Sequence, residues 1–182
     1  MKKALLLTLV LTVCASMAFA QAGSVGLFAD VAGTDCNLSD AAPGLCAYYA
    51  VHVYHAGAIA CQFSAPVPSC FLGTWLSDTA VYPVTVGGSP TGVAIGYGAC
   101  QAAPTHVLTI NMFCQGLTAP CCLYQVVEDP NVPSGQVEVV DCANNLLFGT
   151  GGAAIINADP TCNCDVPTNE STWGKVKSLY TN

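Results

Sequence analysis

The chain has 182 residues, of which only four are lysine or arginine and eleven are aspartate or glutamate, giving a formal net charge of -7. Residues 21–174 contain no lysine or arginine at all. Because lysine and arginine contacts to phosphate supply most nucleic-acid affinity, this acidic composition excludes a nucleic-acid-binding protein. It also disfavours phosphorylated ligands and anionic membranes as partners.

The first 20 residues have the three parts of an export signal. Two lysines at residues 2–3 precede an apolar run at 4–13, and Ala18-Phe19-Ala20 places small residues where a signal peptidase reads the chain. The run is too short to span a bilayer. We therefore expect residues 1–20 to be a cleaved signal peptide, and a protein that is secreted, periplasmic or on the cell surface.

Cys14 leaves a lipoprotein alternative open, because residues 11–14 weakly resemble a lipobox. Val13 is larger than the residue that normally precedes a lipidated cysteine, which favours simple cleavage after residue 20. No later apolar stretch approaches the roughly 20 residues of a membrane helix, so we predict no membrane span.

Strand signals dominate residues 21–165, which we expect to form one domain. Short runs rich in β-branched and aromatic residues alternate with Gly, Pro, Asn and Asp turns. This spacing predicts an all-β, antiparallel sandwich of the immunoglobulin-like or cohesin-like kind, stabilised by disulfides. The expected strands are 24–29, 47–54, 59–64, 79–86, 92–97, 106–113, 123–128, 136–140 and 153–157.

Four oxygen-bearing side chains gather in the loop after the first expected strand. Asp30, Asp35, Asn37 and Asp40 lie within eleven residues, and calcium prefers such hard oxygen ligands. The spacing is not that of an EF-hand, and the same residue types are common in solvated turns. Calcium is therefore the one cofactor for which the sequence offers a weak site; otherwise we expect none.

Groups that could act in catalysis are few and scattered. His52 and His55 are three apart on an expected strand, so alternation predicts opposite faces, one ring half-buried and the other exposed. Glu138 and Asp141 have the same spacing, and His106 begins another strand. No Gly-x-Ser-x-Gly or His-Glu-x-x-His motif is present. We therefore expect no catalytic residues and no enzyme activity.

Eleven cysteines follow the export signal, and an oxidising compartment makes disulfides their expected state. The rival is a structural zinc site, which the Cys121-Cys122 and Cys162-Asn163-Cys164 spacings do not fit. Because eleven is odd, at least one thiol is free or forms an intermolecular disulfide.

The strand order suggests two pairings. If the four strands between residues 92 and 140 form a meander, Cys122 and Cys142 lie at the same end of the sheet and are expected to pair. Cys114 and Cys121 flank a six-residue loop and are expected to close it. Adjacent strand residues point oppositely, so Cys121 and Cys122 should have separate partners.

The last segment, residues 166–182, differs from the rest. Its sequence predicts a short amphipathic helix over 171–180, with Trp173, Val176 and Tyr180 on one face. Both lysines of residues 21–182 lie in this segment. Two interpretations stay open: the apolar face docks on its own sandwich, or the segment is a docking tag that a secretion or anchoring partner reads.

Several short motifs resemble those of a group of uncharacterised secreted bacterial proteins. They are Gly26-Leu27-Phe28-Ala29-Asp30 with the following Gly33-Thr34-Asp35-Cys36, Gly96-Tyr97-Gly98-Ala99-Cys100, Asp141-Cys142-Ala143-Asn144, and the Thr-Trp-Gly-x-x-Lys-x-Leu-Tyr segment at 172–180. The resemblance spans essentially all of residues 21–182 and implies no activity. The strand layout is also similar to cohesin-like and immunoglobulin-like extracellular sandwiches, an analogy of fold alone.

These observations favour a non-catalytic extracellular or cell-surface module that serves in structure, adhesion or ligand binding. A surface glycan or a protein is the expected partner, because exposed aromatic faces or strand edges on a sandwich bind either. The alternative is a secreted hydrolase whose site is assembled from separated loops. Most of the aromatic side chains are nevertheless expected to pack in the core.

Overall fold

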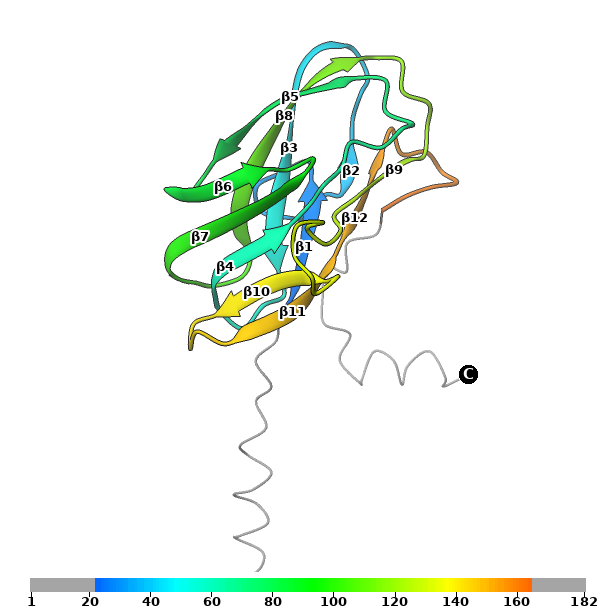
Figure 1. The fold of residues 1–182 in the computed structure, drawn as a ribbon. Coiled ribbons are helices and arrows are strands. Elements are labelled where there is room, and N and C mark those ends of the chain that lie inside the picture. The colour runs from blue at the N-terminus through cyan, green and yellow to red at the C-terminus, as the bar shows by residue number, and fades with distance from the viewer. Residues whose placement is uncertain (1–21, 165–182) are drawn as a thin grey trace, which may run out of the picture.

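The computed structural model describes residues 22–164, and all regular structure within this range is β-strand (Figure 1). No helix in the described range has the length and apolar character needed to cross a bilayer. The expected export signal, Cys14 and the segment after residue 165 lie outside the described residues. The strands are β1 (Ser24–Phe28), β2 (Asn37–Leu38), β3 (Pro43–Val53), β4 (Ala58–Phe63), β5 (Thr74–Ala80), β6 (Val84–Gly88), β7 (Gly92–Gln101), β8 (Thr105–Gln115), β9 (Cys122–Gln125), β10 (Val137–Asp141), β11 (Leu146–Gly151) and β12 (Ala153–Ile156).

Nine of these strands form one long sheet that folds over into two layers. The order is β5-β8-β3-β1-β11-β10-β4-β7-β6, and the only parallel pair in it, β1 with β11, joins the two layers. Side chains that alternate inward from both layers, such as Leu108, Ile110, Phe63 and Ile95, are fully or almost fully buried between them. The predicted all-β sandwich is confirmed for the described residues.

The open side of the sandwich is closed where β5 meets the turn after β6. The Asp78 carboxylate accepts hydrogen bonds from the Ser89 amide at 2.6 Å, the Ser89 hydroxyl at 2.8 Å and the Trp75 indole at 3.1 Å.

The sequence predicted one strand over 79–86, which is wrong. The chain crosses between layers at residues 81–83, and Pro83 has no N–H to continue a ladder.

A small second sheet, ordered β2-β12-β9, lies beside the point where the two layers join (Figure 1). β12 follows β11 directly through Gly151 and Gly152, in a glycine-rich stretch where the sequence predicted no strand before residue 153. A Cβ atom at Gly151 would lie 1.9 Å from the carbonyl oxygen of Val126. The glycines therefore do not end the strand but let a neighbouring backbone approach it closely.

Five disulfides cross-link the described residues, and both predicted pairings are wrong. Cys122 and Cys142 bond to Cys70 and Cys100, and Cys114 and Cys121 bond to Cys46 and Cys162; the fifth pair is Cys36–Cys164. The expected meander does not exist, because β7 pairs with β4 and β6 whereas β8 pairs with β3 and β5. The separate partners of Cys121 and Cys122 are confirmed.

Cys61 is the one free cysteine among residues 22–164. Its side chain is 3% exposed and faces the core from β4. An intermolecular disulfide through this thiol would require the sandwich to open, so the odd cysteine is a core residue rather than a linking group.

Candidate binding face

The acidic side chains of the first loop are each used by a local turn. Asp30 accepts hydrogen bonds from the backbone amides of Ala32, Thr34 and Asp35, and Asp35 accepts one from Asn37. The Asn37 side chain is bonded to the backbone of Cys164. These are the contacts of turn-forming residues, so the oxygens proposed for calcium already have donors, and calcium binding stays a prediction.

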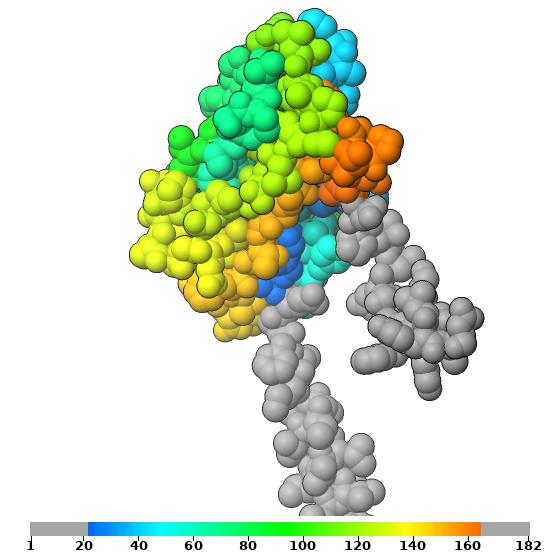
Figure 2. All heavy atoms as spheres, turned by 90° about the vertical axis from the view of Figure 1, so that its right-hand side faces the viewer, coloured from blue at the N-terminus to red at the C-terminus, as the bar shows by residue number. Residues whose placement is uncertain are grey.

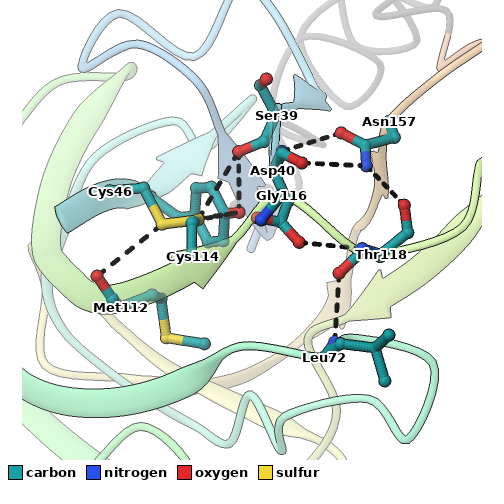
Figure 3. The surroundings of a disulfide bond; sticks show 10 residues. Ser39, Asp40, Cys46, Leu72, Met112, Cys114, Gly116, Thr118 and Asn157 are labelled. Carbon is teal, nitrogen blue, oxygen red and sulfur yellow. Dashed lines mark hydrogen bonds between the residues drawn. A yellow bond between two sulfur atoms is a disulfide. The ribbon is translucent and has the colours of Figure 1, made fainter. Parts of the chain in front are cut away.

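Asp40 does not join the other three residues but lies in a buried polar cluster beside the Cys46–Cys114 disulfide (Figure 3). Its carboxylate accepts the Gly116 amide at 2.6 Å and the Thr118 amide at 3.1 Å. Burial raises the pKa of Asp40, but hydrogen bonds from Thr118 and Gly116 outweigh burial and leave the pKa below its usual value.

The Asn157 side chain ties the same cluster to the end of β12. Its amide nitrogen donates to the Thr118 carbonyl at 2.7 Å, and its oxygen accepts the Asp40 amide at 2.8 Å. The Thr118 hydroxyl accepts the Leu72 amide at 3.1 Å. Four segments distant in sequence thus meet around Asp40 (Figure 3), and this hydrogen-bonded cluster has the role of a structural clasp.

The prediction that His52 and His55 face opposite ways is wrong. β3 ends at Val53, and Tyr54 has a positive φ of 60°, so the alternation of a strand stops before His55. Both imidazoles are buried, and their rings stack with centroids 4.0 Å apart. His52 contacts the carbonyl of Ala22 at 2.7 Å through Nε2, which must therefore carry the proton.

A buried thiol lies close to this pair but is not activated by it. Nδ1 of His52 accepts from the Tyr97 hydroxyl at 3.1 Å, and Tyr97 in turn interacts with the Cys61 side chain. Burial raises the pKa of the Cys61 thiol to about 12 and lowers the pKa of His52 to about 4. Cys61 is thus a neutral thiol and His52 a neutral imidazole, whereas a cysteine nucleophile needs a thiolate beside a positive charge.

The low pKa of His52 predicts a loss of stability in weak acid. The unfolded chain binds a proton near pH 6.5 and the folded protein only near pH 4, so stability is complete above this window and is lost as the pH falls through it. Between pH 7 and pH 5 we expect wild type to lose about 2 kcal/mol of unfolding free energy through this residue.

Urea unfolding at the two pH values measures this effect. His52→Gln should remove most of the loss of unfolding free energy between pH 7 and pH 5. His106→Gln, at a half-buried ring that contacts Thr109, should retain a larger part of that loss. The five aspartates with lowered pKa values titrate below this range. An unchanged pH dependence in His52→Gln would contradict the assignment.

The remaining polar candidates do not converge on a reaction centre. Asp141 is buried and accepts hydrogen bonds from Ala143 and Asn145 in the turn between β10 and β11, while Glu138 lies half-buried on the outer face of β10. The one group of metal-ligand atoms that comes together among residues 22–164 is Cys121, Asp159 and Cys162. Its two sulfur atoms already form a disulfide.

Three tyrosines, at positions 48, 97 and 124, are buried in the core, as the sequence analysis expected for most aromatic side chains. Tyr48 makes edge-to-face contacts with Phe71 and Tyr124, and its hydroxyl donates to the Ser39 carbonyl. No strip of exposed rings is therefore available from these residues for stacking against a sugar.

A different surface stands out: the outer face of the layer β11-β10-β4-β7-β6. Strand register aligns its outward side chains in two rows. One row is Leu146, Val140, Ala60, Gly96 and Val84, and the other is Phe148, Glu138, Gln62, Ala94 and Val86.

Residue size hollows this face into a groove. The central positions on β4 and β7 carry Ala60, Ala94 and Gly96, and the flanking strands carry larger side chains. Val84, Val86 and Leu146 are 59%, 69% and 54% exposed. The hollow encloses about 170 Å³ and is lined by nine residues of the two rows, all except Phe148, which lies at its rim. We call this surface the groove.

The groove is apolar apart from two side chains on its second row. Glu138 is its one ionisable side chain, and the Gln62 amide is turned to the buried Asp129 carboxylate, to which it donates at 2.8 Å. The outer face of the opposite layer is mixed: Asn111 donates to Thr79 and Ser77 there, and the register partners Leu45 and Phe113 are 81% and 41% exposed. What distinguishes the groove is that its exposed apolar surface is also hollowed, as in proteins with a docking site.

The sequence analysis missed the groove because no contiguous motif encodes it. Five strands contribute two outward residues each, and the expected strand over 79–86 obscured the alternation of Val84 and Val86. The usable signal was in residues 92–96 of β7, where both alternating positions carry apolar or small residues, which implies a strand without a polar outer face.

No protein-family profile and no curated protein matches this chain. Among solved structures, it is similar to the sixth cohesin of scaffoldin B from Acetivibrio cellulolyticus, solved with a mutant dockerin: 11% identity, 75% of this chain, 98% of that chain, TM-score 0.46. A cohesin module from a Clostridium perfringens family 33 glycoside hydrolase has 7% identity, coverage of 74% and 98%, and TM-score 0.45. A non-cellulosomal cohesin from Archaeoglobus fulgidus has 9% identity, coverage of 73% and 89%, and TM-score 0.40.

Proposed function

We propose that this protein is an exported, non-catalytic binding module whose groove takes an apolar segment of a protein partner. The observation that carries the proposal is the groove itself: an exposed apolar hollow across five strands, with Glu138 as its single ionisable side chain. Five disulfides among the described residues support export, because such bonds persist in oxidising compartments.

A protein partner fits the groove better than a glycan does. Its walls are valine and leucine, and the one aromatic ring, Phe148, lies at the rim. Glu138 and Gln62 are its only polar side chains, and Gln62 is already bonded to Asp129. Sugars need several polar contacts as well as a stacking ring. An apolar peptide that also carries positive charge matches both the walls and the acidic surroundings.

The described residues favour the binding module over the hydrolase alternative. A hydrolytic site needs a base and an acid within reach of one substrate. The groove contains no histidine, and His52 and His55 are buried between the layers in contact with Ala22, Tyr97 and Thr105.

Site-specific photo-cross-linking in the producing cells tests the proposal. A photoreactive amino acid in place of Val86 should capture a partner protein, because this side chain lies in the groove wall. The same substitution at Val31, which is 54% exposed in the loop after β1, is the matched control and should capture little. Equal capture at both positions, or none at Val86, would refute the groove as the binding face.

A further inference from the structure

The charges of the described residues determine which side chains an occupant of the groove needs. Residues 22–164 contain nine acidic residues and no lysine or arginine, and Glu138 is the charge inside the groove. An occupant therefore gains the most binding free energy if it carries large apolar side chains next to basic ones, because its positive charges then lie against an acidic surface.

One segment of this chain has that chemistry. Within residues 21–182 the only lysine or arginine residues are Lys175 and Lys177, and they are interspersed with Trp173, Val176 and Tyr180. Tryptophan and tyrosine are the residues that most often anchor an interface when they enter a pocket. The segment lies outside the described residues, so its sequence and its point of attachment are the usable facts.

The attachment point favours the groove of another copy over the chain's own groove. The described chain ends at Cys164, which is bonded to Cys36 and contacts Ala153 just beyond β11, on the side of the domain away from β6 and β7 (Figures 1 and 2). Six residues lie between Cys164 and Ser171, and this stretch reaches about 24 Å when fully extended. Phe148, at the near rim of the groove, precedes Ala153 by five positions, about 17 Å along the strand, so a segment that entered its own groove would need a nearly extended linker.

We infer that residues 171–180 of one copy dock in the groove of a second copy. The inference rests on the proposed function and names the partner as the same polypeptide. Residues 171–180 and the groove are different parts of the chain, so the contact is heterologous and leaves one groove and one tail free at the ends. Repetition produces a chain or a ring of modules, a structural role in the extracellular space.

Complementation between two full-length variants tests the inference. Trp173→Asp removes the tail anchor and keeps the groove, whereas Val86→Lys places a positive charge in the groove and keeps the tail. Val31→Lys repeats the second change on exposed surface away from the groove. Sedimentation velocity over a concentration series, on residues 21–182, gives the assembly state of each variant and of mixtures.

Wild type and Val31→Lys should associate progressively with concentration, and each of the other variants should weaken association by about tenfold or more. An equimolar mixture of Trp173→Asp and Val86→Lys should form a one-to-one dimer, because one partner supplies an intact groove and the other an intact tail. Their melting temperatures should stay close to wild type, which separates lost docking from lost folding.

A wild type that stays monomeric at its solubility limit overturns the inference, as does a mixture that does not dimerise. If wild type is monomeric and both variants lower its melting temperature, the tail packs on its own domain and the second-copy contact is wrong. Each of these results leaves the proposed function standing when cross-linking at Val86 captures a different protein, so the two ideas fail separately.

Discussion

Reduction of the disulfides should unfold the protein at room temperature. Each bridge contributes about 2–5 kcal/mol, so five together contribute about 10–25 kcal/mol, which equals or exceeds the roughly 5–15 kcal/mol by which a domain is normally stable. The described residues have no lysine or arginine with which their carboxylates could form ion pairs. The disulfides therefore take the place of the ion pairs that most protein surfaces have.

Thermal melts with and without a strong reductant measure this effect, and melts in low and high sodium chloride are the control. Reduction should abolish the cooperative transition or lower its midpoint by more than 20 °C, since about 1 kcal/mol moves a domain of this size by roughly 2–5 °C. Salt should shift the midpoint by only a few degrees. A reduced form that melts close to the oxidised one would contradict the role given to the bridges.

Replacing Asp40 with alanine should have the largest effect of any single carboxylate substitution. The side chain is 1% exposed, and its loss leaves the buried amides of Gly116 and Thr118 without acceptors. We expect a loss of about 4 kcal/mol in unfolding free energy, because two charge-assisted hydrogen bonds disappear and their donors stay buried.

Asp30→Ala is the matched control for this substitution. Asp30 also accepts several backbone amides, but in a turn at the surface where water replaces the lost acceptor. We expect a loss of about 1 kcal/mol there, and an intermediate loss for Asp40→Asn, which keeps one acceptor oxygen. Urea denaturation gives all three values; equal losses in Asp30→Ala and Asp40→Ala would show that the buried cluster is not a clasp.

Local patterns in the sequence predicted where the strands lie better than which strands pair with one another. The alternating apolar runs correctly indicated β3, β4, β7 and β8, because burial of one face leaves its period in the sequence. β11 was missed because its glycines accommodate a neighbouring backbone rather than a turn. The prediction of one strand over 79–86 was wrong because the chain crosses between the layers there without a glycine, and Pro83 is the only residue that signals the interruption.

Pairing over long distances was not predictable by the same means. Cys46 and Cys114 meet because β3 and β8 are neighbours although 68 residues separate the two sulfurs in sequence, and no local signal states which strands adjoin. The stack of His52 on His55 depends on one positive φ at Tyr54. The groove depends on the register of five strands, which only the folded chain defines.

The Cys36–Cys164 bridge also determines how the protein responds to pulling. It joins two residues 128 positions apart, near the two ends of the described chain. Tension applied outside this pair passes through the sulfur–sulfur bond, and the strands between Cys36 and Cys164 carry no load. Of the described residues, only β1 and the loop after it can be drawn out, about 50 Å of chain for some 15 residues. A module pulled by its termini would thus yield by one short, fixed length and then resist as a covalent link, with its groove still folded.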